Sequence, residues 1–190
     1  DDESAKQVYE FVEMDTPILV IEGRDKDKSD VVLKPKFNVS KIPDIDVRSF
    51  LIQNLNTGEI IPEKNSEKIY PIASLTKLMT AIVAHEILYL GNQIYDSESG
   101  VSYTGLDMLY PLLMQSSNSI AKSLADHYGH ASFVGNMNIK AKSLSMYDSS
   151  FADSSGLSSE NTSTAKDISK LLKYIYNQRY FIYEITRGEL

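Results

Sequence analysis

The chain has 190 residues, of which 42% are hydrophobic and 24% charged, a composition typical of a globular protein rather than a disordered one. Its formal net charge is -7 and it has no basic cluster, which argues against nucleic acid as a partner. The absence of cysteine excludes disulfide bonds and thiolate metal sites, and no apolar run approaches the roughly 20 residues that a membrane-spanning helix needs.

The first part of the sequence predicts strands and loops. Residues 18–23, ILVIEG, begin with four apolar side chains and could form a short strand, and the charged run over residues 23–30 is typical of a solvated loop. Apolar and polar side chains then alternate on both sides of an Asn-Thr-Gly break at residues 56–58. This pattern predicts a hairpin with strands near residues 48–54 and 59–63.

Helical spacing begins after residue 71. Apolar residues at intervals of three and four predict one helix that ends at Gly91. A loop is expected over residues 93–103, and a turn-rich loop over residues 151–161. Further helices are predicted over residues 104–114, 118–128, 132–144 and 163–176. Thr104 and Asp107 have the spacing of a capping box, Gly129 should end the 118–128 helix, and Ser163 or Thr164 with Asp167 should open the last helix. Strands followed by a block of helices predict an α+β (mixed) fold, in which the hairpin needs strand partners that the sequence does not provide.

Three Ser-x-x-Lys tetrads occur, about as many as chance provides: Ser74 with Lys77, Ser119 with Lys122, and Ser163 with Lys166. Only the first stands at a predicted strand-to-helix junction with an apolar face behind it. The positive end of the helix dipole would favour an alkoxide on Ser74 and a neutral amine on Lys77, and burial would lower the pKa of Lys77 further. A neutral lysine can accept the proton of a nucleophilic serine. The alternative is that Ser74 is an ordinary helix cap and Lys77 a solvated lysine.

Three stretches then act together: PIASLTKLMTA at residues 71–81, SSN at 116–118 and DSSGLSSENTSTAKDI at 153–168. They resemble the low-molecular-mass penicillin-binding proteins, which are serine D-alanyl-D-alanine carboxypeptidases and endopeptidases. The resemblance implies a β-lactamase/transpeptidase-like sheet with an inserted helical subdomain. It divides the chain into a lead-in over residues 1–45 and the N-terminal part of that domain over residues 46–190.

The same resemblance implies a role for each motif residue. Ser74 matches the acylated nucleophile and Lys77 its general base. Ser116 matches the serine that relays a proton towards the leaving group, and Asn118 the amide that positions the substrate backbone. The expected substrates are peptidoglycan stem peptides, cut after D-alanine, and β-lactams should acylate the same serine. No metal or cofactor is expected, and the expected location is the bacterial cell envelope outside the cytoplasm.

The family's third motif, Lys-Thr-Gly on a late strand, has no match in the 190 residues. The missing motif and the missing strand partners predict that the sequence is the front part of a longer protein, completed by a C-terminal segment. That segment could also contact a membrane surface or a second chain. Two alternatives remain: a catalytically incomplete penicillin-binding or sensor module, and a class A-type β-lactamase with Glu160 as its deacylating base. The β-lactamase is disfavoured because the GLSSEN surroundings of Glu160 match the carboxypeptidase loop better.

Overall fold

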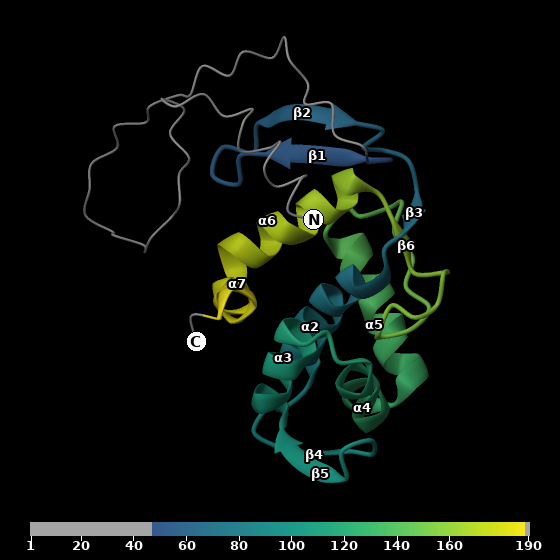
Figure 1. Cartoon of the computed structure of the whole chain (residues 1–190), viewed down its shortest axis with the longest axis vertical. Helices are drawn as coiled ribbons and strands as arrows, with labels where there is room; N and C mark the ends of the chain where they lie inside the picture. The colour runs from purple at the N-terminus through teal and green to yellow at the C-terminus, as the bar shows by residue number, and fades with distance from the viewer. Residues whose placement is uncertain (1–46, 189–190) are drawn as a thin grey trace, which may run out of the picture.

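The computed structural model describes residues 47–188, which form a helical body with three two-stranded antiparallel sheets (Figure 1). The strand expected over residues 18–23, the charged loop after it and the lead-in over residues 1–45 lie outside the described residues. The mixture of helices and small sheets confirms the predicted α+β class.

The predicted N-terminal hairpin is present. Strands β1 (Phe50–Gln53) and β2 (Ile60–Lys64) pair with Phe50 opposite Lys64. The side chain of Asn54 accepts hydrogen bonds from two backbone N–H groups of the connecting turn, and Gly58 takes the positive φ of 77° that the turn requires. Within the described part of the chain β1 and β2 pair only with each other. Helix α6 (Ala165–Gln178) contacts β1 (Figure 1).

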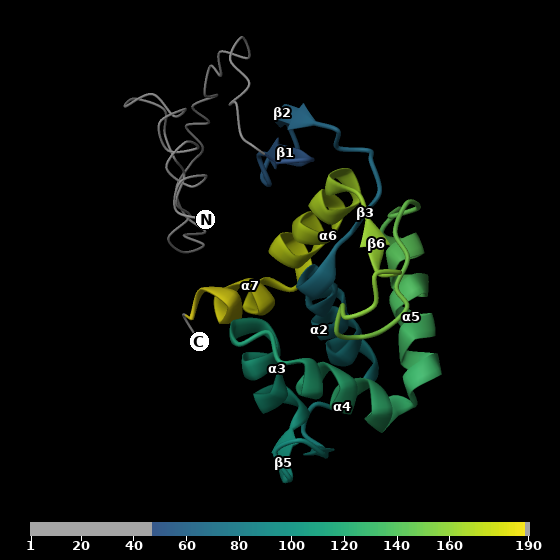
Figure 2. The same ribbon diagram turned by 45° about the vertical axis from the view of Figure 1, so that its right-hand side comes forward.

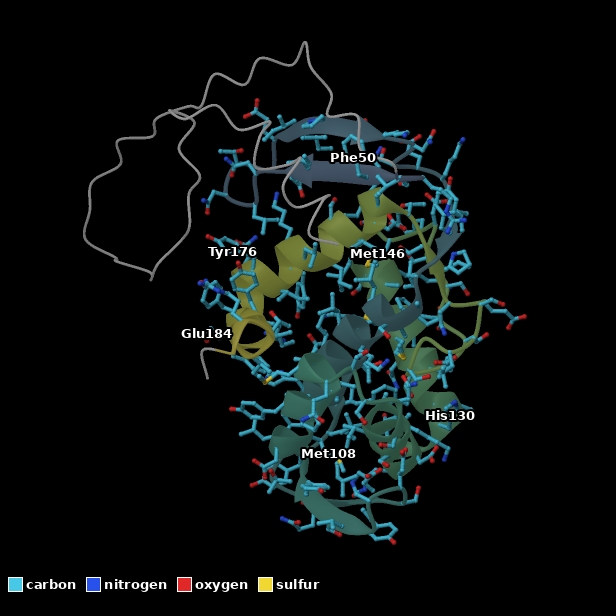
Figure 3. All side chains as sticks on the ribbon, viewed as in Figure 1. Phe50, Met108, His130, Met146, Tyr176 and Glu184 are labelled. Atoms are coloured by element: carbon cyan, nitrogen blue, oxygen red, sulfur yellow. The ribbon has the colours of Figure 1, made fainter. Side chains whose placement is uncertain are left out.

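Helix α2 (Thr76–Ile87) is the central element, and a short 3-10 turn, η1 (Ala73–Leu75), leads into it. Its residues Met79, Ala81 and Ile82 are fully buried, because α3 (Gly105–Met114), α4 (Asn118–Tyr128) and α5 (His130–Ser143) all contact it. Figure 3 shows side chains filling the space among these helices, with Met108 of α3 and Met146 labelled; both are fully buried. The apolar stripe that predicted α2 therefore faces the core.

The prediction of a loop over residues 93–103 is wrong. This segment forms a hairpin of β4 (Gln93–Asp96) and β5 (Val101–Thr104). Its strands are too short for their alternation to stand out in the sequence. The hairpin is fixed by Asp96, whose buried carboxylate accepts hydrogen bonds from Ser99 N at 3.0 Å and from Ser123 Oγ of α4 at 3.0 Å. Asp96, which the sequence alone would suggest to be a charged surface residue, thus joins the hairpin to α4.

The predicted helix caps are confirmed. Thr104 accepts a hydrogen bond from Asp107 N at the start of α3, and Thr164 accepts one from Asp167 N at the start of α6. Helix α4 ends at Gly129, which has a φ of 105°. The predicted helix boundaries are therefore accurate to a few residues, because local side-chain chemistry determines them.

The last helix, α7 (Tyr180–Arg187), was not predicted. It turns back from the end of α6 and contacts α3 (Figure 2). At the α6–α7 junction Arg179 donates to Glu86 Oε1 at 3.0 Å, and Lys140 donates to the same oxygen at 2.7 Å. The hydroxyl of Tyr174 donates to it as well, at 2.5 Å. Glu86 of α2 therefore binds α5, α6 and the start of α7.

A short antiparallel pair brings the 151–161 loop back to the start of α2. Strand β3 (Tyr70–Pro71) pairs with β6 (Thr162–Ser163), and Ile72 N donates to the carbonyl of Asn161 at 3.0 Å. This pairing, seen on the right of Figure 1, joins segments about 90 residues apart in sequence. No described helix combines the length and the apolar character that crossing a membrane requires.

Candidate active site

Ser74 lies at the junction that the sequence predicted. It is in the 3-10 turn η1, two residues ahead of the first residue of α2, and its side chain is exposed. The preceding residue, Ala73, has a φ of 45°, which is unfavourable for a residue with a Cβ. The side chain of Ser74 makes no cap hydrogen bond to α2. The helix-cap alternative for Ser74 is therefore not what the geometry shows.

The amine of Lys77 is the centre of the site. The residue is only 2% exposed, and its Nζ lies 2.7 Å from Asn118 Oδ1, 2.7 Å from the carbonyl oxygen of Ser155 and 3.2 Å from Ser74 Oγ. The amide and carbonyl oxygens can only accept hydrogen bonds, whereas the serine hydroxyl can also donate one. A neutral Lys77 would use its two N–H groups on Asn118 and Ser155. Its lone pair would then be directed at the hydroxyl of Ser74.

The electrostatics of the site shift the amine of Lys77 towards that neutral form. Burial lowers the pKa of Lys77 below its usual value, and the negative charge of Asp153 opposes the change in part. Burial acts to raise the pKa of Asp153, but the backbone N–H groups of Ser158, Gly156 and Ser155 outweigh it and lower that pKa to about 2. The site therefore combines a desolvated amine with a carboxylate that stays ionised.

The second motif lies beside the first. Ser117 caps α4 and accepts a hydrogen bond from Ile120 N at 3.3 Å, so Asn118 occupies the first position of the helix. Ser116 has a φ of 55°, again in the left-handed region that residues with a Cβ seldom adopt. Within the described part of the chain its hydroxyl makes no hydrogen bond. Strained backbone at both Ala73 and Ser116 is typical of functional sites.

A pocket of about 380 Å³ opens beside these groups. Ser74, Lys77 and Ser116 line it, together with Thr186 of α7 and apolar side chains of α2 and α3. The four residues expected from the sequence therefore gather at one place: three on the pocket wall, and Asn118 through its contact with Lys77. These four residues lie up to 44 positions apart in sequence, and the contacts of α2 with α3 and α4 bring them together.

The competing sequence matches lie elsewhere. Lys122 forms an ion pair with Asp126 on the surface, and Lys166 pairs with the exposed Glu67 at 2.6 Å.

Asn161 is fully buried and its side chain donates to Asp153 at 3.0 Å, so it stabilises the 151–161 loop and does not line the pocket. Glu160 is exposed and is not part of the pocket wall. Its position does not support the β-lactamase alternative.

Sequence reasoning missed Asp153, the carbonyl of Ser155, and Thr186. A backbone acceptor such as the Ser155 carbonyl cannot be inferred from the residue type, because every residue has a carbonyl group. Asp153 did leave a signal, because aspartate followed by Ser-Ser-Gly is a frequent turn in which the carboxylate accepts nearby backbone N–H groups. Thr186 lies on a helix that was not predicted, so its place beside Ser74 could not be anticipated.

Comparison with known proteins decides the family. A sequence model of the family described as D-alanyl-D-alanine carboxypeptidase, Peptidase_S11, matches residues 36–92 and 90–189. The chain belongs to this family. The match covers all three stretches on which the resemblance to low-molecular-mass penicillin-binding proteins was based.

Individual relatives agree with this assignment. A D-alanyl-D-alanine endopeptidase from Escherichia coli (strain K12) is 39% identical over 147 residues, which are 68% of this chain and 47% of the relative. The crystal structure of a D-alanyl-D-alanine carboxypeptidase from Mycobacterium tuberculosis H37Rv is 27% identical, with a TM-score of 0.70 over 77% of this chain and 61% of that one. Penicillin-binding protein D2 from Listeria monocytogenes, solved in its ampicillin-bound form, is 28% identical, with a TM-score of 0.64 over 70% of this chain and 62% of that one.

These structures confirm the predicted penicillin-binding/transpeptidase-like fold. The chain spans about half the length of the curated relatives it matches.

Proposed function

We propose that the protein is a serine peptidase of peptidoglycan that cuts the bond after a D-alanine of the stem peptide. The observation that carries this proposal is the buried amine of Lys77, 3.2 Å from the exposed hydroxyl of Ser74. Burial and the two fixed acceptors leave the amine suited to accept a proton. The family to which the chain belongs supplies the substrate class.

The reaction would proceed through an acyl-enzyme. Lys77 accepts the Ser74 proton, and the Oγ of Ser74 attacks the D-alanine carbonyl carbon to give a tetrahedral intermediate. Ser116, on the same pocket wall, relays a proton to the departing amine as the peptide bond breaks. Because Asn118 Oδ1 is bound to Lys77, its amide NH2 remains to donate to the substrate backbone. Water then hydrolyses the ester and returns the proton to Ser74.

Two substrate bonds fit this chemistry. The leaving group is free D-alanine in a carboxypeptidase reaction and the side-chain amine of a second stem peptide in a cross-link. The relative named as an endopeptidase supports the cross-link, and the carboxypeptidase neighbour supports the terminal D-alanine. Chromatography of digests of a synthetic pentapeptide and of purified cross-linked peptidoglycan would separate the two. A protein with this proposed substrate would act in the bacterial envelope outside the cytoplasm.

A fluorescent penicillin tests the proposal. A β-lactam imitates the D-alanyl-D-alanine end and acylates the serine, and the Listeria protein was solved with ampicillin bound. We expect covalent labelling of the wild-type protein and none of Ser74→Ala. Ser119→Ala is the matched control, because Ser119 belongs to a second Ser-x-x-Lys tetrad inside α4 and bonds to Ser117. Labelling of Ser74→Ala at the wild-type rate would contradict the assignment.

A penicillin-binding module without turnover is the second candidate. Such a module would be labelled by penicillin on Ser74 and would release no D-alanine from the pentapeptide. The D-alanine assay therefore distinguishes it from the peptidase.

A further inference from the structure

The carboxylate of Asp153 organises the loop that faces the serine–lysine pair. Its Oδ1 accepts hydrogen bonds from the backbone N–H groups of Ser155 and Gly156, both at 2.6 Å, and from the hydroxyl of Ser155 at 2.9 Å. Its Oδ2 accepts from Ser158 N at 2.7 Å and from Asn161 Nδ2 at 3.0 Å. Five donors thus converge on one side chain, and together they fix the backbone of residues 153–158.

That turn touches the reacting groups at two points. The carbonyl of Ser155 accepts the 2.7 Å hydrogen bond from the amine of Lys77. The backbone of Gly156 lies against the carbonyl of Ala73, the residue before Ser74. The position of the turn therefore determines where the amine lies, and it supports the backbone that carries the nucleophile.

We propose that Asp153 is a positioning residue for the serine–lysine pair. It holds the Ser155 carbonyl in place so that the amine of Lys77 keeps its lone pair on Ser74, and it contributes a negative charge to the surroundings of that amine. The inference rests on the proposed function, in which Lys77 is the base. An ordinary turn aspartate would share the hydrogen bonds but would leave the titration of the lysine unchanged.

The charge of Asp153 is distinguishable from other charges near α2. Among residues 47–188 it is the charge that acts on Lys77, where it opposes the effect of burial on the pKa of that amine. Burial and Asp153 are the causes of the shift, and the other charged or titratable groups on α2, on the helices that contact it and on the 151–161 loop are not among them: His85, Glu86, Asp107, Tyr110, Lys122, Asp126, His127, Tyr128, His130, Lys140, Lys142 and Glu160. Several of these have other partners, such as Lys122 with Asp126 and Lys140 with Glu86.

The experiment measures fluorescent-penicillin acylation as a function of pH in Asp153→Asn. Removing the carboxylate loosens the turn, and we expect the plateau rate to fall about 10- to 100-fold, as small displacements of catalytic groups do. Removing the negative charge also lowers the pKa of Lys77 further. Because the neutral amine is the active form, the acidic limb of the rate profile should move to lower pH. An acidic limb that stays in place would overturn the proposal.

Two further variants separate charge from loop order. Asn161→Ala removes a donor to Asp153 and loosens the same loop but keeps the carboxylate, so its acidic limb should remain at the wild-type pH. Asp153→Glu keeps the charge and lengthens the side chain, so its plateau should fall at least ~10-fold while the limb stays. This variant decides the matter if Asp153→Asn does not fold. An unchanged plateau in Asp153→Glu would then overturn the proposal.

A second measurement does not depend on the acylation of Ser74 by penicillin. Competitive acetylation of Lys77 with acetic anhydride, followed by mass spectrometry across pH, reports the titration of the amine itself. We expect that titration to move to lower pH in Asp153→Asn, and an unmoved titration would contradict the inference. Failure of wild-type labelling, by contrast, would contradict the proposed peptidase and leave this result interpretable.

Discussion

A side-chain carbon on Gly156 would lie 2.0 Å from the carbonyl oxygen of Ala73. The two residues belong to segments more than 80 positions apart, and one of them directly precedes Ser74. The contact is between backbones, so neither partner can move aside by changing a rotamer. The φ of Gly156 is +89°, a value that other residues adopt only with strain.

Gly156→Ala should therefore be strongly unfavourable. The positive φ alone costs roughly 1–2 kcal/mol, and the close approach to Ala73 must be relieved by moving the loop away from η1. We expect a loss of unfolding free energy of more than about 1 kcal/mol together with slower acylation, measured by urea unfolding and penicillin labelling. The control is Gly135→Ala, at an exposed helical position of α5 with no atoms near its Cβ. That change should stabilise the protein by about 0.5–1 kcal/mol.

Lys77→Arg tests the base directly. Arginine keeps the charge but does not deprotonate in proteins, so it cannot accept the Ser74 proton. We expect acylation to slow at least ~100-fold, the lower range for loss of general-base catalysis. Lys166→Arg is the matched control, because Lys166 occupies the same place in a Ser-x-x-Lys tetrad but is paired with an exposed glutamate. It should acylate at the wild-type rate, and an equally fast Lys77→Arg would rule out the proposed role.

Asp153 should make the protein sensitive to acid. Its pKa is lowered from 3.8 to about 2 in the folded state, so its contribution is fully present above the unfolded value and is lost as pH falls through the folded one. At about 1.4 kcal/mol per pKa unit this contribution is at most about 2 kcal/mol, and solvent screening reduces it because the side chain is only partly buried. Between pH 5 and pH 2, urea unfolding should therefore show a smaller loss of unfolding free energy in Asp153→Asn than in the wild type, by up to about 2 kcal/mol. Equal losses would mean that the carboxylate is not stabilised as described.

Glu86→Gln should destabilise the junction of α6 and α7. The carboxylate receives Lys140, Tyr174 and Arg179 on one oxygen, and a neutral amide leaves two cations without their counter-charge. We expect the unfolding free energy to fall by about 1–3 kcal/mol, because these side chains are largely shielded from water. Glu67→Gln removes the partner of Lys166 at the surface and should leave the unfolding free energy nearly unchanged, because water and salt screen an exposed ion pair. Equal effects of the two changes would contradict a special role for Glu86.

The sequence predicted those parts of the fold that local chemistry determines. The hairpin at Asn54–Gly58, the caps at Thr104 and Thr164 and the apolar stripe of α2 each depend on residues within a few positions of one another. The hairpin β4–β5 and helix α7 were missed because tertiary contacts stabilise them. Asp96 binds Ser123 of α4, and α7 is held through Arg179. Neither contact has a local signature.

The same difference between local and tertiary signals applies to the candidate site. Ser74, Lys77, Ser116 and Asn118 could be named because their motifs are short and their order along the chain is distinctive. The acceptors that hold Lys77 could not be ranked from the sequence, since one is a backbone carbonyl 78 residues away. Their roles in catalysis remain predictions, which the variants of Ser74, Lys77 and Asp153 address.

The three hydrogen-bond partners of Lys77 also determine when the site can exist. They lie 3, 41 and 78 residues from it in sequence, so two of the three bonds require long loops to close. In an isolated helical turn the serine and lysine would be neighbours, but the amine would be hydrated and charged and could not accept a proton. A newly synthesised chain would therefore resist acylation by a β-lactam until the loop beyond residue 153 has docked on α2. Nucleophilicity at Ser74 would appear as a late event of folding, when these non-local contacts form.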